Sequence, residues 1–115
     1  MKVYIAGPIT GYEDGNRAAF RKAEAELILK GHVPVNPHTV KPQHDDDCYA
    51  RKIGRHSALV DGHHSEHSYA CHLRADIIAL LDCEAITMLP EWTISRGATA
   101  EFAVANAMGM EVIDL

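Results

Sequence analysis

The chain has 115 residues, of which 47% are hydrophobic and 23% are charged, and it contains 8 Gly and 5 Pro. This length and composition predict one globular domain with its own core, and they exclude two full domains or a disordered chain. The formal net charge of -5 leaves no broad basic face, which argues against polymeric nucleic acid as a partner, although one or two Arg would suffice for a free nucleotide.

The first half of the chain predicts two strands on either side of a helix. Residues 2–6 form an uninterrupted β-prone run that a Gly-Pro pair stops, which predicts a buried strand. Asn16 is placed to cap a helix that continues to about residue 30, because apolar residues recur there with helical spacing. Residues 33–35 predict a short strand, and Pro34, which lacks a backbone N–H donor, places this strand near a sheet edge.

The middle of the chain differs from both ends. Residues 38–67 show no sustained period and contain many His, Asp and Gly, which predicts a long loop with one helical turn around residues 48–53. Helices and strands then alternate again. They are a helix over residues 68–82, a strand over 85–89, an Ala-rich helix from 96 or 97 to 108, and a last strand over 110–113.

This alternation predicts the fold class. Strands joined by helices form right-handed βαβ units, and these build a parallel sheet with helices on both faces. We therefore expect one α/β domain over residues 1–115, interrupted by the loop 38–67. Its architecture would be a three-layer, flavodoxin- or Rossmann-like sandwich with a mainly parallel sheet of four to five strands. Ligands of such sheets bind beyond the carboxyl ends of the strands, where the strand order reverses.

Targeting signals and cysteine usage indicate the compartment. The apolar runs fall far short of the roughly 20 residues that a membrane span needs. Met1 is followed directly by strand-like residues, without the apolar region and cleavage site of a signal peptide. The cysteines are odd in number and form no C-x-x-C pair; they are Cys48, Cys71 and Cys83. We expect a cytoplasmic protein with reduced thiols and no membrane partner.

The turn after the first strand is the first candidate site. It consists of Gly7, Pro8, Ile9, Thr10 and Gly11. Its glycines let the backbone approach a ligand closely, and its free amides can bind a phosphate or a sugar hydroxyl. The turn is neither G-x-G-x-x-G nor a P-loop, so an ordinary strand-to-helix turn remains an alternative. Tyr4, just before it, is either a core aromatic or a catalytic group.

Two acidic residues provide the second candidate site. Asp76 lies beside the apolar stripe of its helix, which would push its carboxylate toward the sheet and raise its pKa. The alternative is a solvated position or an ion pair with Arg74. Glu101 lies near the start of the last helix, where small neighbours such as Gly97 and Ala98 leave its carboxylate open to a ligand. Because the helix dipole favours negative charge there, we expect Glu101 to remain ionised, as a nucleophile must be.

Together these motifs resemble the nucleoside 2-deoxyribosyltransferase superfamily, most closely a small, largely uncharacterised phage and prophage branch. The resemblance is carried by residues 4–11, by Asp76 and Glu84, and by residues 97–102. It covers about residues 1–37 and 68–115 and leaves the loop 38–67 unmatched.

The resemblance implies an activity and a set of residues. Members of the superfamily cleave the N-glycosidic bond of 2'-deoxynucleosides or their 5'-monophosphates and pass the sugar to another base or to water. Glu101 would be the nucleophile, Asp76 would position the deoxyribose and manage protonation of the base, and the Tyr4 hydroxyl would lie near the nucleophile. Glu84 falls where relatives usually carry Asp, and Ser95 resembles a phosphate-contacting serine. The candidate substrate-binding residues are Gly7, Pro8, Ile9, Thr10, Gly11, Glu84, Trp92, Ser95, Arg96 and Gly97.

The choice between hydrolase and transferase stays open at this point. A covalent deoxyribosyl-carboxylate intermediate would be resolved by water in the one case and by a second base in the other. Arg17 or Arg96 could hold a 5'-phosphate and favour nucleotides, and Trp92 could stack on a base. We expect no cofactor and no metal.

Alternatives from other classes also remain open. In one alternative, the predicted substrate site binds or senses a nucleotide without catalysing a reaction. In another alternative, His67 and Cys71 bind zinc, because their spacing suits it. Otherwise the His-rich loop is either a solvated polar loop or a loop that reaches over the base. The Ala-rich last helix leaves apolar surface, and relatives in the superfamily bring residues from a neighbouring subunit into each site. We therefore expect a homodimer or a larger homo-oligomer.

Overall fold

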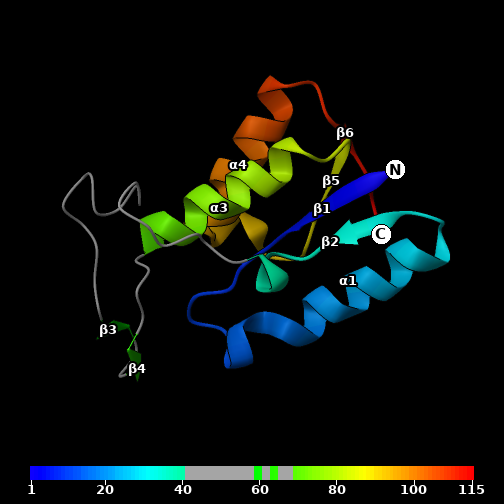
Figure 1. Cartoon of the computed structure of the whole chain (residues 1–115). Coiled ribbons are helices and arrows are strands. Elements are labelled where there is room, and N and C mark those ends of the chain that lie inside the picture. The colour runs from blue at the N-terminus through cyan, green and yellow to red at the C-terminus, as the bar shows by residue number, and fades with distance from the viewer. Residues whose placement is uncertain (41–58, 61–62, 65–68) are drawn as a thin grey trace.

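A four-stranded, all-parallel sheet forms the centre of the protein (Figure 1). The computed structural model describes residues 1–40, 59–60, 63–64 and 69–115. The strands, in the spatial order β2-β1-β5-β6, are β1 (Lys2–Ala6), β2 (Val33–Val35), β5 (Ala85–Met88) and β6 (Glu111–Val112). The helices of the described residues are α1 (Arg17–Leu29), α3 (Tyr69–Leu81) and α4 (Arg96–Ala107). The expected α/β class and sheet size are therefore confirmed.

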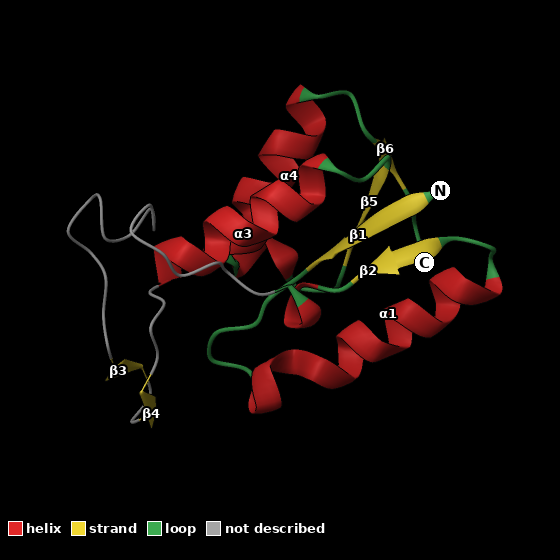
Figure 2. Ribbon diagram, viewed as in Figure 1, coloured by secondary structure: helices red, strands yellow, loops and turns green. Residues whose placement is uncertain are grey.

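Helices cover both faces of the sheet, so the fold has three layers (Figure 2). Side chains of a strand point to opposite faces in turn, and β1 supplies both cores in this way. Val3 and Ile5 pack in one cluster with Phe20 and Leu27 of α1. Residues 4 and 6 of the same strand pack in the other cluster with side chains that include Leu80 of α3 and Ala98 and Ala105 of α4. This alternation places the Tyr4 side chain on the α3–α4 side.

Most of the predicted elements are confirmed, with ends that shift by one or two residues. β2 lies at an edge of the sheet, as Pro34 predicts. The predicted cap of α1 is wrong. Asn16 stands before the helix with a φ of 62°, and its side chain makes no capping hydrogen bond. Its Nδ2 instead donates to the carbonyl oxygen of Pro8 at 3.0 Å, which ties the helix to the turn after β1.

The long loop is only partly described. A short 3₁₀ turn, Pro37–Thr39, follows β2. Two-residue strands, β3 (Leu59–Val60) and β4 (His63–His64), pair antiparallel, although the sequence predicts no strand there. The helical turn predicted around residues 48–53 lies outside the described residues. No helix in the described part of the chain is long and apolar enough to cross a membrane.

The strand order reverses between β1 and β5, because β1 pairs with β2 on one side and with β5 on the other. The carboxyl ends of β1 and β5 therefore form the switch point at which such sheets bind ligands. Gly7 and Leu89 follow these two ends, and the Leu89 amide donates to the carbonyl oxygen of Ala6 at 2.8 Å. A Cβ at position 7 would lie 2.7 Å from the Cβ of Leu89, so the close packing of the two ends requires glycine there.

Candidate functional site

A buried tyrosine–glutamate pair joins β1 to α4. Glu101 lies in the second turn of α4 and is only 5% exposed. The Tyr4 hydroxyl, which is fully buried, donates a hydrogen bond to Oε2 of Glu101. The alternation of β1 points Tyr4 at this layer, and the small side chains around Glu101 on α4 allow the helix to approach the sheet. Two of the three predicted catalytic residues therefore meet in the structure.

Asp76, the third predicted catalytic residue, lies on α3 close enough to act on the same pair. Its side chain is partly buried and makes no ion pair within the described part of the chain, so neither the solvated position nor the pair with Arg74 is observed. Burial raises the pKa of Asp76 to about 7. The charge of Asp76 in turn raises the pKa of Glu101 and that of Tyr4. Tyr4, Asp76 and Glu101, here called the acid cluster, thus form one electrostatic unit.

The protonation of Glu101 differs from the sequence-based expectation. Burial raises the pKa of Glu101 to about 8, the charge of Asp76 raises it too, and the hydrogen bond from Tyr4 acts in the opposite direction. The expectation that the helix dipole keeps Glu101 ionised is therefore wrong. Glu101 lies beyond the first turn of α4, where the dipole acts most strongly, and the loss of hydration dominates. Burial and the Glu101 charge also raise the pKa of Tyr4 far above its usual range.

The turn after β1 divides into a buried and an exposed part. Gly7 and Pro8 are buried, Ile9 is partly buried, and Thr10 and Gly11 are exposed. Gly11 has a φ of +84°, a left-handed conformation that glycine adopts without strain. The need for Gly7 is explained by Leu89, and the predicted contact of this turn with a sugar or a phosphate stays a prediction.

The residues at the start of α4 have structural partners. Ser95 caps the helix, because its Oγ accepts a hydrogen bond from the Ala98 amide at 3.1 Å. The guanidinium of Arg96 lies over the Tyr69 ring, 5.7 Å from its centroid. A Cβ at position 97 would lie 3.4 Å from the Tyr69 hydroxyl. Tyr69 therefore faces both Arg96 and Gly97, which the sequence analysis did not foresee.

Trp92 and Glu84 have structural partners. The Trp92 ring packs against Phe102 of α4, with ring centroids 4.8 Å apart, and against the core cluster that contains Tyr4. The Glu84 carboxylate accepts a hydrogen bond from the Lys2 amide at 3.2 Å, at the amino end of β1. The ligand-binding end of the sheet is the opposite one, so the structure does not bring Glu84 together with Glu101.

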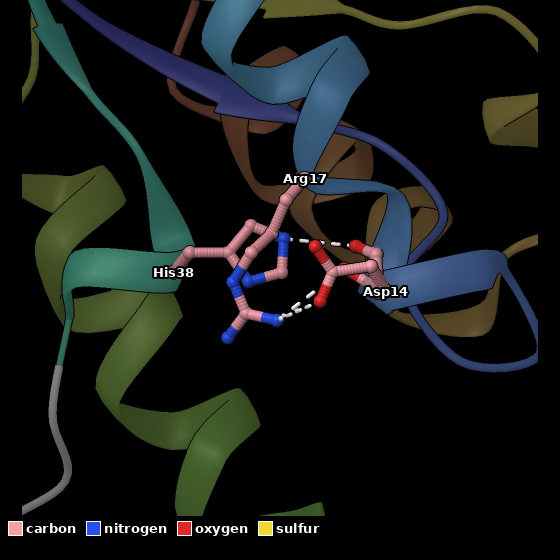
Figure 3. Close-up of polar contacts among 4 residues, drawn as sticks. Asp14, Arg17 and His38 are labelled. Atoms are coloured by element: carbon pink, nitrogen blue, oxygen red, sulfur yellow. Dashed lines mark hydrogen bonds and ion pairs between the residues drawn. The ribbon is translucent and has the colours of Figure 1, made fainter.

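Two loop contacts were missed by the sequence analysis. The Tyr12 hydroxyl donates to Oε1 of Glu91 at 3.0 Å, which links the loop after β1 to the loop after β5. His38 lies beside Arg17, and Asp14 faces the Arg17 guanidinium (Figure 3). The spacing of Asp14 and Arg17 is a local i,i+3 pattern, whereas no local pattern signals the other contacts, because they join residues from separate loops.

The part of the chain that the structure describes also has recesses on the α1 side of the sheet. One of about 540 Å³ is bounded by α1, by the segment that follows β5 and by the C-terminal residue. Within the residues that the structure describes, no group of three or more His, Cys, Asp or Glu side chains could hold a metal ion. The zinc hypothesis depends on Cys71 of α3 and on His67, which lies outside the described residues, and it stays a prediction.

Fold and site together define an α/β protein with an open parallel sheet and a buried acidic cluster on one face. Residues 1–114 match the family described as "Domain of unknown function (DUF4406)", and the chain belongs to this family. A solved structure, of a conserved protein from Enterococcus faecalis V583, is similar with a TM-score of 0.62 and 22% identity. The similarity covers 99% of this chain and 62% of that chain, and at this identity it shows the fold alone. No curated protein shows significant sequence similarity to the chain.

Proposed function

We propose that the protein cleaves the N-glycosidic bond of a 2'-deoxynucleoside or of its 5'-monophosphate. The observation that carries this proposal is the buried hydrogen bond between Tyr4 and Glu101, with the Asp76 carboxyl in electrostatic contact. The resemblance of the same motifs to the nucleoside 2-deoxyribosyltransferase superfamily supports it.

In the proposed reaction the carboxylate of Glu101 attacks the anomeric carbon of the deoxyribose. As the new C–O bond forms, the C–N bond breaks and its electron pair passes to the base, which takes a proton from Asp76. Water or a second base then attacks the same carbon, the ester to Glu101 breaks, and Asp76 accepts a proton from the incoming group. Two displacements retain the configuration of the sugar. The absent 2'-hydroxyl eases formation of positive charge on the ring.

The reaction requires one protonation state of the acid cluster. The pair must carry a single proton, on Asp76, while Glu101 is ionised, and this is the less favoured one-proton state of the free protein, because the pKa of Glu101, about 8, lies above that of Asp76, about 7. A pKa of about 7 suits Asp76 for giving and taking a proton near neutral pH. Burial opposes the ionisation of Glu101, whereas the Tyr4 hydrogen bond favours it. Positive charge developing on the sugar would favour the ionised form of Glu101 further.

The experiment is a base-release assay with the four common 2'-deoxynucleosides and their 5'-monophosphates, with and without a second free base. The proposal expects release by the wild type and a loss of at least about 10³-fold in E101Q and D76N. Tyr4→Phe should reduce the rate by a smaller factor, because it removes only the hydrogen bond to Glu101. Asp82→Asn is the matched control, since it removes an exposed carboxylate outside the acid cluster, and it should leave the rate within about twofold.

A second candidate function is non-catalytic binding of a nucleotide. The raised pKa of Glu101 favours it, because a protonated carboxyl group is a poor nucleophile but a good hydrogen-bond donor. The two functions separate in one experiment. If the wild type releases no base from any of these compounds while one of them raises the melting temperature, the catalytic proposal is wrong and the binding function stands.

We also propose that the protein works as a homodimer or a larger homo-oligomer in the cytoplasm. Large apolar side chains are exposed near both ends of α4, including Ile94 and Met108. Cys83 is free and buried, which suits a reducing compartment. Light scattering on the purified protein tests the assembly, and a monomeric mass at working concentration would contradict it.

A further inference from the structure

A polar recess lies between the start of α1 and the turn that follows β2. Its volume is about 210 Å³. The lining residues are Arg17, Arg21, Glu24, Asn36, His38 and Thr39. They come from the α1 layer and from the edge of the sheet, whereas Tyr4 and Glu101 lie in the layer of α3 and α4. The recess is therefore distinct from the acid cluster, and an inference about it does not depend on the proposed glycosidase function.

Asn36 lines this recess and carries a buried hydrogen-bond donor. The side chain is 5% exposed and lines the recess, and its Oδ1 accepts a hydrogen bond from the His38 amide at 2.9 Å. Because only the oxygen can accept that bond, the orientation of the amide is fixed and the second position is the NH₂ group. Within the described ranges this Nδ2 donates to no protein group. Buried donors in folded proteins almost always have a partner, so this one points to a ligand acceptor.

Two arginines add positive charge to the same recess. Arg17 uses one guanidinium nitrogen to bind the Asp14 carboxylate at 3.0 Å, which leaves its other N–H groups available. Arg21 lies one helical turn further along α1 and makes no ion pair with any described residue. Guanidinium groups and an amide N–H₂ are all donors, and phosphoryl oxygens are all acceptors.

The pKa of His38 depends on the charges that line the recess. Its Nε2 is bonded to the Gly15 carbonyl oxygen at 2.8 Å, and its ring packs edge-on against Phe20. Burial lowers the pKa of His38, and the charges of Arg17 and Arg21 lower it as well, whereas the Gly15 carbonyl and the charge of Asp14 raise it. An anion bound between the arginines would offset their effect and raise the pKa of His38.

We propose that this recess binds a phosphoryl group, carried by a phosphate monoester or by free phosphate. Asn36 supplies a directed donor, and Arg17 and Arg21 supply charge from one side of the recess. The carboxylate of Glu24 also lines the recess, and together with Asp14 it offsets the two arginines. We therefore expect roughly millimolar affinity for inorganic phosphate, with recognition by hydrogen bonds more than by net charge.

The test is calorimetric titration of the full chain at constant ionic strength with inorganic phosphate, methyl phosphate and a nucleoside 5'-monophosphate as separate probes. Arg21→Gln should weaken phosphate binding about tenfold. Asn36→Asp should weaken it at least as much, because Asp keeps the acceptor for the His38 amide but loses the donor and adds a negative charge. Lys22→Gln is the charge-matched control, since Lys22 lies on the same helix outside this recess, and it should change binding less than about twofold.

Several outcomes would overturn the proposal. They are no heat with any of the three probes at about 20 mM, equal weakening by K22Q and R21Q, and undiminished binding in N36D. A second readout follows the ring signals of His38 by NMR as pH changes. At a phosphate concentration near the wild-type Kd, phosphate should raise the pKa of His38 in the wild type and raise it much less in R21Q, and an unchanged pKa in the wild type would also refute the site. Tighter binding of one ester than of free phosphate identifies the source of the phosphoryl group.

Discussion

Replacing Glu101 with Gln removes a buried charge while keeping the size of the side chain and an acceptor for the Tyr4 hydroxyl. In the wild type, burial raises the pKa of Glu101 from 4.5 to about 8. The folded state therefore holds a proton that the unfolded chain has already released between these pH values. Stability must fall as pH rises from about 5 to about 8 and then level off. A Gln at position 101 does not titrate and removes this part of the pH dependence.

The size of the effect follows from the same pKa values. At about 1.4 kcal/mol per pKa unit, a rise from 4.5 to about 8 corresponds to at most about 4 to 5 kcal/mol. Glu101 is only 5% exposed, so solvent screening reduces this figure little. E101Q and the wild type should have similar free energies of unfolding at about pH 5, and E101Q should be more stable by several kcal/mol at about pH 9. That difference is a large fraction of the total stability of a small domain.

Urea denaturation at about pH 5, 7 and 9 measures these free energies directly. The Asp76 contribution remains in both proteins, because burial raises its pKa as well. Glu13→Gln serves as the control, since Glu13 is exposed, and its stability should run parallel to that of the wild type. Parallel curves for E101Q and the wild type would refute the burial argument for Glu101.

Three further predictions concern packing, capping and catalysis. Gly7→Ala should destabilise by about 1 to 3 kcal/mol because its Cβ would meet the Cβ of Leu89; the cost should persist in a Leu89→Ala background, which keeps that Cβ, and disappear in a Leu89→Gly background, and equal costs in all backgrounds would contradict this explanation. Ser95→Ala should cost about 1 kcal/mol by loss of the α4 cap, while Ser95→Thr should cost much less in the same urea titration. If base release occurs, kcat/KM should follow a bell-shaped pH profile. Its maximum should lie between about pH 7 and about pH 8, where the Asp76–Glu101 pair carries one proton. A rate that rises steadily to about pH 10 would exclude Asp76 as the acid.

The layered fold was predictable because its signals are local. The apolar run of β1, the proline of β2 and the helical spacing of α1 each act within a few residues, and together they determine the layers. Capping was harder to predict. The sequence analysis assigned Asn16 as a cap, but this residue adopts a left-handed conformation and binds Pro8. Ser95 caps α4 without being recognised as a cap, because it was considered only as a phosphate contact.

The candidate site was predictable in its members but not in its electrostatics. Tyr4, Asp76 and Glu101 converge as the motif order suggests, because they lie on β1, α3 and α4 around one face of the sheet. The pKa of Glu101 could not be predicted, because the helix dipole is a local effect whereas desolvation depends on how closely α4 packs against the sheet. For the same reason the recess around Asn36 and His38 has no sequence signature, since its residues come from two separate elements.

The contact between Tyr12 and Glu91 has a consequence for exchange of small molecules with the switch point. The hydrogen bond joins the loops that follow β1 and β5, and it is exposed. Glu91 adopts the left-handed backbone conformation, with a φ of 66°. Breaking an exposed bond of this kind costs about 1 kcal/mol, and leaving that conformation relieves backbone strain. Breaking the contact between these two loops therefore requires rotation of a phenol side chain and a local backbone rearrangement.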